Sequence, residues 1–209
     1  MITVSSLQFL TMGVFFGLTA GISPGPLLTL VITETLQHNK TEGIKIAISP
    51  LITDIPIIVI TYFIFSKFSQ FNIVLSLISF LGGIFIAYLG YEAIKSKGLD
   101  INVQRLKSDS LKKGVTANFL NPSPYLFWLT IGTPIAFKAY GISLVTVILY
   151  FLSFYTLLIG SKICIVLIVE RSKTLLDNRA YIWAMRILGI TLFIFAIFFF
   201  YDGIKILSN

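Results

Sequence analysis

Residues 7–32 read LQFLTMGVFFGLTAGISPGPLLTLVI, an apolar stretch long enough to cross a bilayer and interrupted near its end by Ser23-Pro24-Gly25-Pro26. A proline lacks an amide donor and clashes with the carbonyl four residues earlier, so these prolines should free the carbonyls of Ala20 and Ile22. Unpaired backbone groups are too costly to face lipid. The sequence therefore predicts a broken membrane helix whose break is buried in protein or lines a watery cavity.

Five further apolar stretches follow, and short polar connections separate them. Stretches of this length predict an all-α, polytopic membrane helix bundle of six transmembrane helices that forms one transmembrane domain over residues 1–209. The helices are predicted at residues 7–32, 43–65, 71–94, 114–137, 141–169 and 181–206. The longest connection is the basic loop 95–113.

Composition agrees with a membrane protein. The 209 residues are 56% hydrophobic and only 12% charged, which is more apolar side chain than a soluble domain of this size can bury. The net charge of +7 comes mainly from residues in the connections, so no basic and aromatic surface for nucleic acid is expected. The single cysteine and the single histidine predict neither a disulfide nor a metal site, and no cofactor is implied.

Lys and Arg in the connections indicate an orientation. The first, third and fifth connections hold eleven of them and the other side holds three, which predicts that loop 95–113 is cytoplasmic and that both termini are extracytoplasmic in the cell membrane. No basic residue precedes the first apolar stretch, so we expect that helix to be retained rather than cleaved as a signal.

The fourth stretch carries a second double-proline break, Asn121-Pro122-Ser123-Pro124, which should free the carbonyls of Asn118 and Leu120. Two halves of three helices have opposite orientations in the membrane, so the pair of breaks indicates a three-plus-three inverted repeat with Pro-broken helices 1 and 4. The register differs, because the break lies late in the first stretch and early in the fourth.

A broken helix offers free carbonyls for cations and a half-helix N-terminus for anions. The amides that follow the two breaks could together hold a carboxylate, and the nearby asparagines add donors and acceptors. These amides belong to Leu27, Leu28, Tyr125 and Leu126. The candidate substrate-binding residues are Pro24, Gly25, Pro26, Asp54, Asn118, Asn121, Pro122 and Pro124.

Asp54 is the only acidic residue well inside a predicted helix, and an intramembrane carboxylate is a functional candidate by default. Ser49, Pro50 and Thr53 share its helical face and extend a polar stripe. A structural salt bridge from Asp54 to one of the two basic residues within predicted helices is the alternative, and it is compatible with a functional role.

Those two basic residues, Lys162 and Arg186, lie near predicted cytoplasmic ends, and we expect both to extend their charges to the interface. Three acids at helix ends should also be interfacial: Glu34, Glu92 and Asp202. Isolated prolines such as Pro56 and Pro134 are expected only to kink their helices. The small residues Gly83, Ala87 and Gly90 should form a packing face.

Four stretches together resemble the lysine exporter (LysE/RhtB) family: GISPGP (21–26), GGIFIAYLGY (82–91), GVTANFLNP (114–122) and RILG (186–189). The resemblance runs nearly end to end. It implies export of amino acids or related small metabolites driven by the proton gradient, and a carboxylate in the second helix at Asp54. Many members have a Lys after Asn-Pro where this chain has Ser123, so the way in which the substrate carboxylate is held stays open.

We therefore expect an amino-acid exporter that is not an enzyme, works in the lipid bilayer and uses the proton as its coupling ion. An inorganic cation transporter is the main alternative, because free carbonyls, Asn and Asp are oxygen ligands. An intramembrane enzyme is disfavoured because no His-Glu-x-x-His pair is present and no base stands near a nucleophile. A purely structural protein would leave seven intramembrane prolines unexplained. The sequence leaves a homo-oligomer open.

Overall fold

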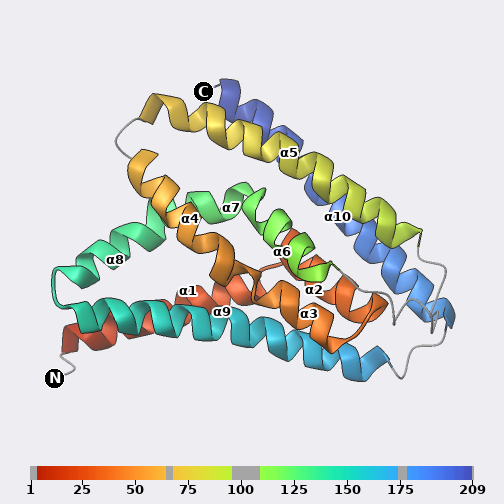
Figure 1. The fold of residues 1–209 in the computed structure, drawn as a ribbon, viewed down its shortest axis with the longest axis horizontal. Coiled ribbons are helices and arrows are strands. Elements are labelled where there is room, and N and C mark those ends of the chain that lie inside the picture. The colour runs from red at the N-terminus through yellow and green to blue at the C-terminus, as the bar shows by residue number, and fades with distance from the viewer. Residues whose placement is uncertain (1–3, 65–67, 96–108, 174–177, 209) are drawn as a thin grey trace.

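The computed structural model describes residues 4–64, 68–95, 109–173 and 178–208, and every regular element in these ranges is helical. Figure 1 shows their arrangement. In chain order the elements are α1 (Val4–Ile22), α2 (Pro26–Gln37), α3 (Lys40–Ala47), α4 (Ser49–Ile64), α5 (Phe68–Ile94), α6 (Ser110–Phe119), α7 (Pro122–Phe127), the π-helical turn η2 (Trp128–Gly132), α8 (Thr133–Tyr140), α9 (Leu144–Lys173) and α10 (Asn178–Ser208).

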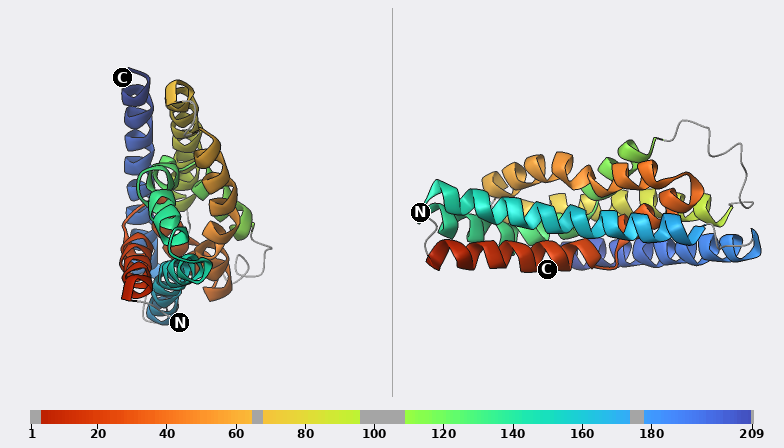
Figure 2. Two further views of the ribbon diagram at one scale, coloured as in Figure 1. Left: turned by 90° about the vertical axis from the view of Figure 1, so that its left-hand side faces the viewer. Right: turned by 90° about the horizontal axis from the view of Figure 1, so that it is seen from below.

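Two pairs of long helices flank the shorter ones (Figures 1 and 2). Helices α1 and α9 run parallel, because Ser6 hydrogen-bonds to Thr146 at 2.8 Å near their beginnings and the last turn of α1 contacts α9 further along. Helices α5 and α10 run antiparallel, because the Ser76 hydroxyl donates to the Gly203 carbonyl at 2.6 Å. The short helices fill the space between the two pairs.

Glycines permit the close approach of both pairs. A Cβ at Gly17 would collide with the Phe154 carbonyl of α9, so α1 lies directly against the α9 backbone. A Cβ at Gly90 would lie 2.9 Å from the Gly189 carbonyl of α10, and one at Gly83 would lie 3.1 Å from the Phe200 ring. The predicted packing face of the third stretch is thereby confirmed.

The apolar core lies where the short helices meet the long ones. Its largest buried cluster joins Leu30 of α2, Ile46 of α3 and Ile86 of α5 to Val166 of α9 and Leu192 of α10. Many apolar side chains on the outer faces of the long helices are exposed instead, as Leu152 and Ile197 are at 62% and 66%. Lipid is the environment that covers such faces in a membrane protein.

The number of spans differs from the six predicted. Within the described residues, four helices are long and apolar enough to cross a membrane, and α1 with α2 can count as a fifth, bent span. The predicted helix 114–137 is divided among α6, α7, η2 and α8, each too short to span alone. Its division follows from the break at Asn121 and from Pro134, which cannot donate a backbone hydrogen bond and is the second residue of α8, just after the π-helical turn. Pro56, by contrast, lies inside the continuous helix α4.

Candidate functional site

The first predicted break is confirmed as a change of helix direction. Helix α1 ends at Ile22, α2 begins at Pro26, and the two axes differ by 59°. Pro26 occupies the first helical position, where its missing amide leaves no hydrogen bond unmade and its fixed φ favours a helix start. Gly25 is extended, with φ of −170°, and a Cβ added to it would meet nothing within 4 Å. The break therefore opens onto empty space at Gly25.

The second break is also present, and two of the carbonyls beside it accept hydrogen bonds. Asn121 caps α7 by accepting the Ser123 amide at 3.0 Å, and Pro122 begins the helix. The Asn118 carbonyl was predicted to be free, and this is wrong, because it accepts the Asn121 amide at 3.2 Å. The neighbouring Phe119 carbonyl accepts the Tyr125 hydroxyl at 2.8 Å. A local turn and a nearby phenol thus occupy the Asn118 and Phe119 carbonyls.

A cavity of about 390 Å³ lies between the two breaks. This volume is in the range of small-molecule sites. Seven of the eight sequence-predicted binding residues line it: Pro24, Gly25, Pro26, Asp54, Asn118, Asn121 and Pro124. Pro122, the buried first residue of α7, does not line it. The fold thus brings residues from α2, α4, α6 and α7 to one space.

Asp54 lies on α4 and is 4% exposed. Its carboxylate accepts hydrogen bonds from the Tyr155 hydroxyl at 3.1 Å and from the Asn118 amide at 3.4 Å. The Asn118 amide also contacts the Thr53 hydroxyl at 2.6 Å, which extends the polar stripe predicted along this face of α4. Neutral donors from two other elements, α6 and α9, therefore hold the carboxylate in place.

The structural salt bridge offered as the alternative for Asp54 is absent from the described part of the chain. The ion pairs found there join Glu34, Glu42 and Glu92 to basic side chains, and none includes Asp54. The carboxylate faces the cavity without a cationic partner.

Lys162 of α9 is a site residue that the sequence reasoning missed. It was expected to extend its charge to the interface, but it is 3% exposed and lines the cavity. Its ammonium donates to the carbonyls of Gly21 at 2.9 Å and Ala20 at 3.3 Å. At 1.5 Å per residue it lies roughly 16 Å from the end of α9, which is beyond the reach of a lysine side chain. The Ala20 carbonyl that Pro24 was predicted to release is thus bound by this lysine.

A signal for Lys162 was present in the sequence. The buried residues of α9 recur every four positions, and Lys162 follows Tyr150, Phe154 and Leu158 in this series. A lysine on the buried stripe of a membrane helix predicts a cavity or a partner rather than an interfacial position. Arg186 is different, because it is exposed and lies over the Trp183 ring at 5.5 Å. Its interfacial position stays a prediction.

Aromatic side chains form another part of the cavity wall. The rings of Phe127 and Phe154 stack with centroids 5.4 Å apart, and Trp128 meets Phe154 edge to face at 5.4 Å. From α10, Phe198 and Phe199 line the same space, together with the half-buried Asp202 that was expected at an interface. Apolar walls with a few polar groups are typical of small-molecule sites.

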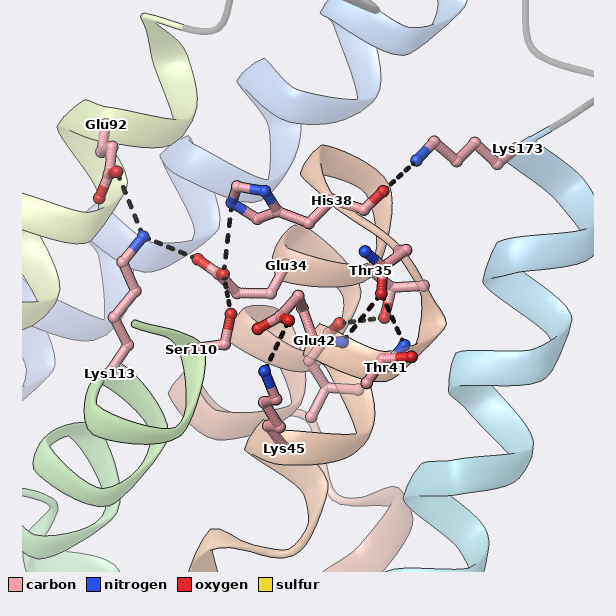
Figure 3. Close-up of polar contacts among 12 residues, drawn as sticks. Glu34, Thr35, His38, Thr41, Glu42, Lys45, Glu92, Ser110, Lys113 and Lys173 are labelled. Carbon is pink, nitrogen blue, oxygen red and sulfur yellow. Dashed lines mark hydrogen bonds and ion pairs between the residues drawn. The ribbon is translucent and has the colours of Figure 1, made fainter. Parts of the chain in front are cut away.

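A second polar cluster lies apart from the cavity, at the meeting of α2, α5 and α6 (Figure 3). Its centre is Glu34, which was predicted to be interfacial but is 1% exposed. The Glu34 carboxylate accepts the Ser110 hydroxyl at 2.5 Å and the Lys113 ammonium at 2.8 Å, and His38 lies 3.7 Å away. Buried charges require such partners.

Lys113 joins this cluster to α5 by a second contact, 3.2 Å from the Glu92 carboxylate. Burial alone would lower the pKa of Lys113, but the charges and hydrogen bonds of Glu34 and Glu92 raise it above its ordinary value. The lysine therefore stays charged and holds α6 against α2 and α5. On the other side, Lys173 of α9 donates to the His38 carbonyl at 2.8 Å.

Comparisons with known proteins agree with the motifs. Residues 18–203 match the family model described as LysE type translocator. A protein of Bacillus subtilis (strain 168) named "Putative amino acid efflux protein YcgF" is 23% identical over 199 residues, which covers 92% of this chain and 95% of that protein. No solved structure matches the chain.

Proposed function

Because the chain belongs to the LysE type translocator family, we propose that it exports amino acids or related small metabolites across the cell membrane in exchange for protons. The observation that carries the proposal is that residues of both helix breaks and Asp54 line the same cavity. The name of the Bacillus subtilis relative, an efflux protein for amino acids, supports the substrate class.

In this mechanism Asp54 holds either the ammonium of the substrate or a proton. Loaded from the cytoplasm, the site releases its substrate outside and takes up a proton there. The carrier then returns with a neutral Asp54, which avoids moving an uncompensated charge through the bilayer interior. The donors from Tyr155 and Asn118 keep the carboxylate facing the cavity throughout.

The orientation proposed from the charges places the basic connections in the cytoplasm and both termini outside. Helices α5 and α9 end, and α10 begins, toward the right in Figure 1, whereas α1 begins and α10 ends away from that side. Such an arrangement supports termini on one face of the membrane. The Glu34 cluster then lies on the cytoplasmic side of the cavity.

We also propose the three-plus-three inverted repeat, with α6 to α8 as a broken fourth span. Its support is the pairing of helices: α1 packs on α9, the fifth predicted span, while α4, the second, packs on α6, α7 and η2 of the fourth. The third and sixth, α5 and α10, pack on each other. An inverted repeat requires this reciprocal pairing.

The inorganic cation alternative fits the cavity less well. Lys162 places a buried ammonium in its wall, and the Ala20 and Asn118 carbonyls that could have served as cation ligands accept hydrogen bonds instead. A positive charge in the wall repels a bare cation but attracts the carboxylate of an amino acid. Within the described residues there is also no group of three acidic, His or Cys side chains that could hold a metal ion.

Efflux from proteoliposomes tests the proposed function. Vesicles containing the purified chain are loaded in turn with each of the twenty labelled amino acids, or with Mn²⁺, and placed in buffer of lower external pH. We expect the chain to accelerate the loss of at least one amino acid relative to empty vesicles, while Mn²⁺ is retained. Accelerated loss of Mn²⁺ with every amino acid retained would instead establish the cation alternative.

A further inference from the structure

The cavity has two buried charges of opposite sign, Asp54 and Lys162, and neither forms an ion pair with any part of the chain that the structure describes. A buried charge without a counter-ion is strongly destabilising. Both side chains face space that a small molecule can enter. A wall that keeps an ammonium and a carboxylate apart is complementary to a ligand that carries both charges.

The contacts of Lys162 leave it able to bind a ligand. An ammonium has three N–H donors, and the carbonyls of Gly21 and Ala20 accept two of them. These carbonyls are neutral, so they orient the lysine without cancelling its charge. The lysine is thus held at the end of α1, beside the break, with donor capacity remaining.

The surroundings of Lys162 favour an anion. Leu27 and Leu28, in the first turn of α2, line the same cavity, and the amide end of that helix adds a positive partial charge. The remaining ionisable residue of the wall, Asp202, has the same charge as Asp54 and so cannot provide a second anion site. Lys162 is therefore the group in the described wall that can pair with a carboxylate.

We propose that Lys162 binds the carboxylate of the substrate while Asp54 binds its ammonium, so that the site selects zwitterionic α-amino acids over amines. This inference rests on the proposed function. Two charged contacts at opposite ends of one small molecule fix its orientation in the cavity. The aromatic wall formed by Phe127, Trp128 and Phe154 is then left to contact the side chain of the substrate.

A lysine with a purely structural role would hold α1 in place but would not distinguish an amino acid from an amine. The test therefore compares the affinities of these two kinds of ligand. Binding is measured on the purified full chain by competition against the labelled amino acid that the vesicle assay selects. The competitors are that amino acid and its decarboxylated amine; for leucine the amine is 3-methylbutylamine. We expect the unaltered chain to bind the amino acid about tenfold or more tightly than the amine, as a charged hydrogen bond implies.

Two variants test whether Lys162 causes the preference for the amino acid over the amine. Lys162→Met should lose most of the preference for the amino acid, because the contact with the carboxylate is removed while the contact of Asp54 with the ammonium remains. The matched control is Lys173→Met on the same helix, since Lys173 also donates to a carbonyl but does not line the cavity. The control should keep the full preference.

The outcomes separate the two proposals. If the vesicle assay finds no amino acid substrate, the proposed function fails. If a substrate is found but the amine binds to the unaltered chain equally well, or Lys162→Met retains the preference, the role of Lys162 is overturned while the proposed function stands. If Lys162→Met does not fold, binding of the amino acid and of the amine is compared on the unaltered chain and on Lys162→Arg. The arginine variant should keep the preference for the amino acid, because an arginine retains a charge for the carboxylate.

Discussion

The Tyr155 hydroxyl of α9 donates a hydrogen bond of 3.1 Å to the Asp54 carboxylate of α4. This contact joins two elements that are distant in the sequence, and it places Asp54 opposite the helix that carries Lys162. Neutral donors to a carboxylate stabilise its ionised form. The relationship therefore links the position of α9 to the proposed competition between substrate and proton.

Tyr155→Phe keeps the ring and removes this donor. Without it the ionised carboxylate is less stable, so protons compete better and substrate binding should require a higher pH. Half-maximal binding, measured as a function of pH, should shift upward by about half a unit to one unit, which corresponds to the loss of one hydrogen bond.

The control is Tyr150→Phe. The Tyr150 hydroxyl is buried and has no hydrogen-bond partner, and the residue does not line the cavity. Its removal should leave the pH dependence unchanged. An unshifted profile for Tyr155→Phe, or the same shift in both variants, would show that the contact with Asp54 does not control proton competition.

Gly25→Val should close the cavity while the chain still folds. The new side chain extends into space that is empty within 4 Å of its Cβ, and the extended backbone of Gly25 suits valine. Loss of glycine before α2 costs about 1 kcal/mol at most. Efflux should fall about tenfold or more.

Gly160→Val is the matched control, because a Cβ there also meets nothing within 4 Å but lies outside the cavity. Normal efflux by the Gly25 variant would remove this space from the substrate path.

Lys113→Met should destabilise the chain by about 2 to 3 kcal/mol, since it leaves the Glu34 carboxylate buried without its ammonium. The figure is reduced from that of a fully buried pair because the Lys113 side chain is 19% exposed. Adding Glu34→Gln should recover much of the loss. Unfolding of the purified protein in detergent measures both, and equal stability of the single and double variants would contradict the account.

Lys45→Met is the control for this cluster. The pair that Lys45 forms with Glu42 is more exposed, with 40% of the lysine side chain accessible, so its loss should cost less than about 1 kcal/mol.

The proposed orientation predicts opposite labelling of two sites. In a chain with Cys164→Ala, a cysteine at the exposed position Lys112 should be shielded from impermeant thiol reagents in intact cells. One at the exposed position Lys138 should react. The reverse pattern would place the termini in the cytoplasm.

Local rules in the sequence predicted the breaks and the intramembrane acid. Proline chemistry located both breaks to within a residue or two, and hydrophobicity set Asp54 apart. These predictions succeed because each depends on a few neighbouring residues. The predicted count of six spans went further than the fold supports, because the fourth stretch is divided by its own prolines and a π-helical turn.

Pairings between distant segments were not predictable from the same rules. Lys162 meets the end of α1, and Glu34 meets Ser110 and Lys113, across more than 70 positions of sequence. A single charged residue in a hydrophobic stretch fits either an interface or a buried partner. Only the packing of the helices decides between the two.

The most direct test of the account is amino-acid efflux from proteoliposomes against imposed pH gradients, with the unaltered chain, Asp54→Asn and, as control, the exposed Asp109→Asn. Asparagine keeps the size of Asp54 but cannot ionise. We expect a pH gradient to drive efflux through the unaltered chain and Asp109→Asn, and to have no effect on Asp54→Asn although that variant still assembles. Efflux by Asp54→Asn at the parental rate and with the parental pH dependence would contradict exchange of substrate and proton at Asp54.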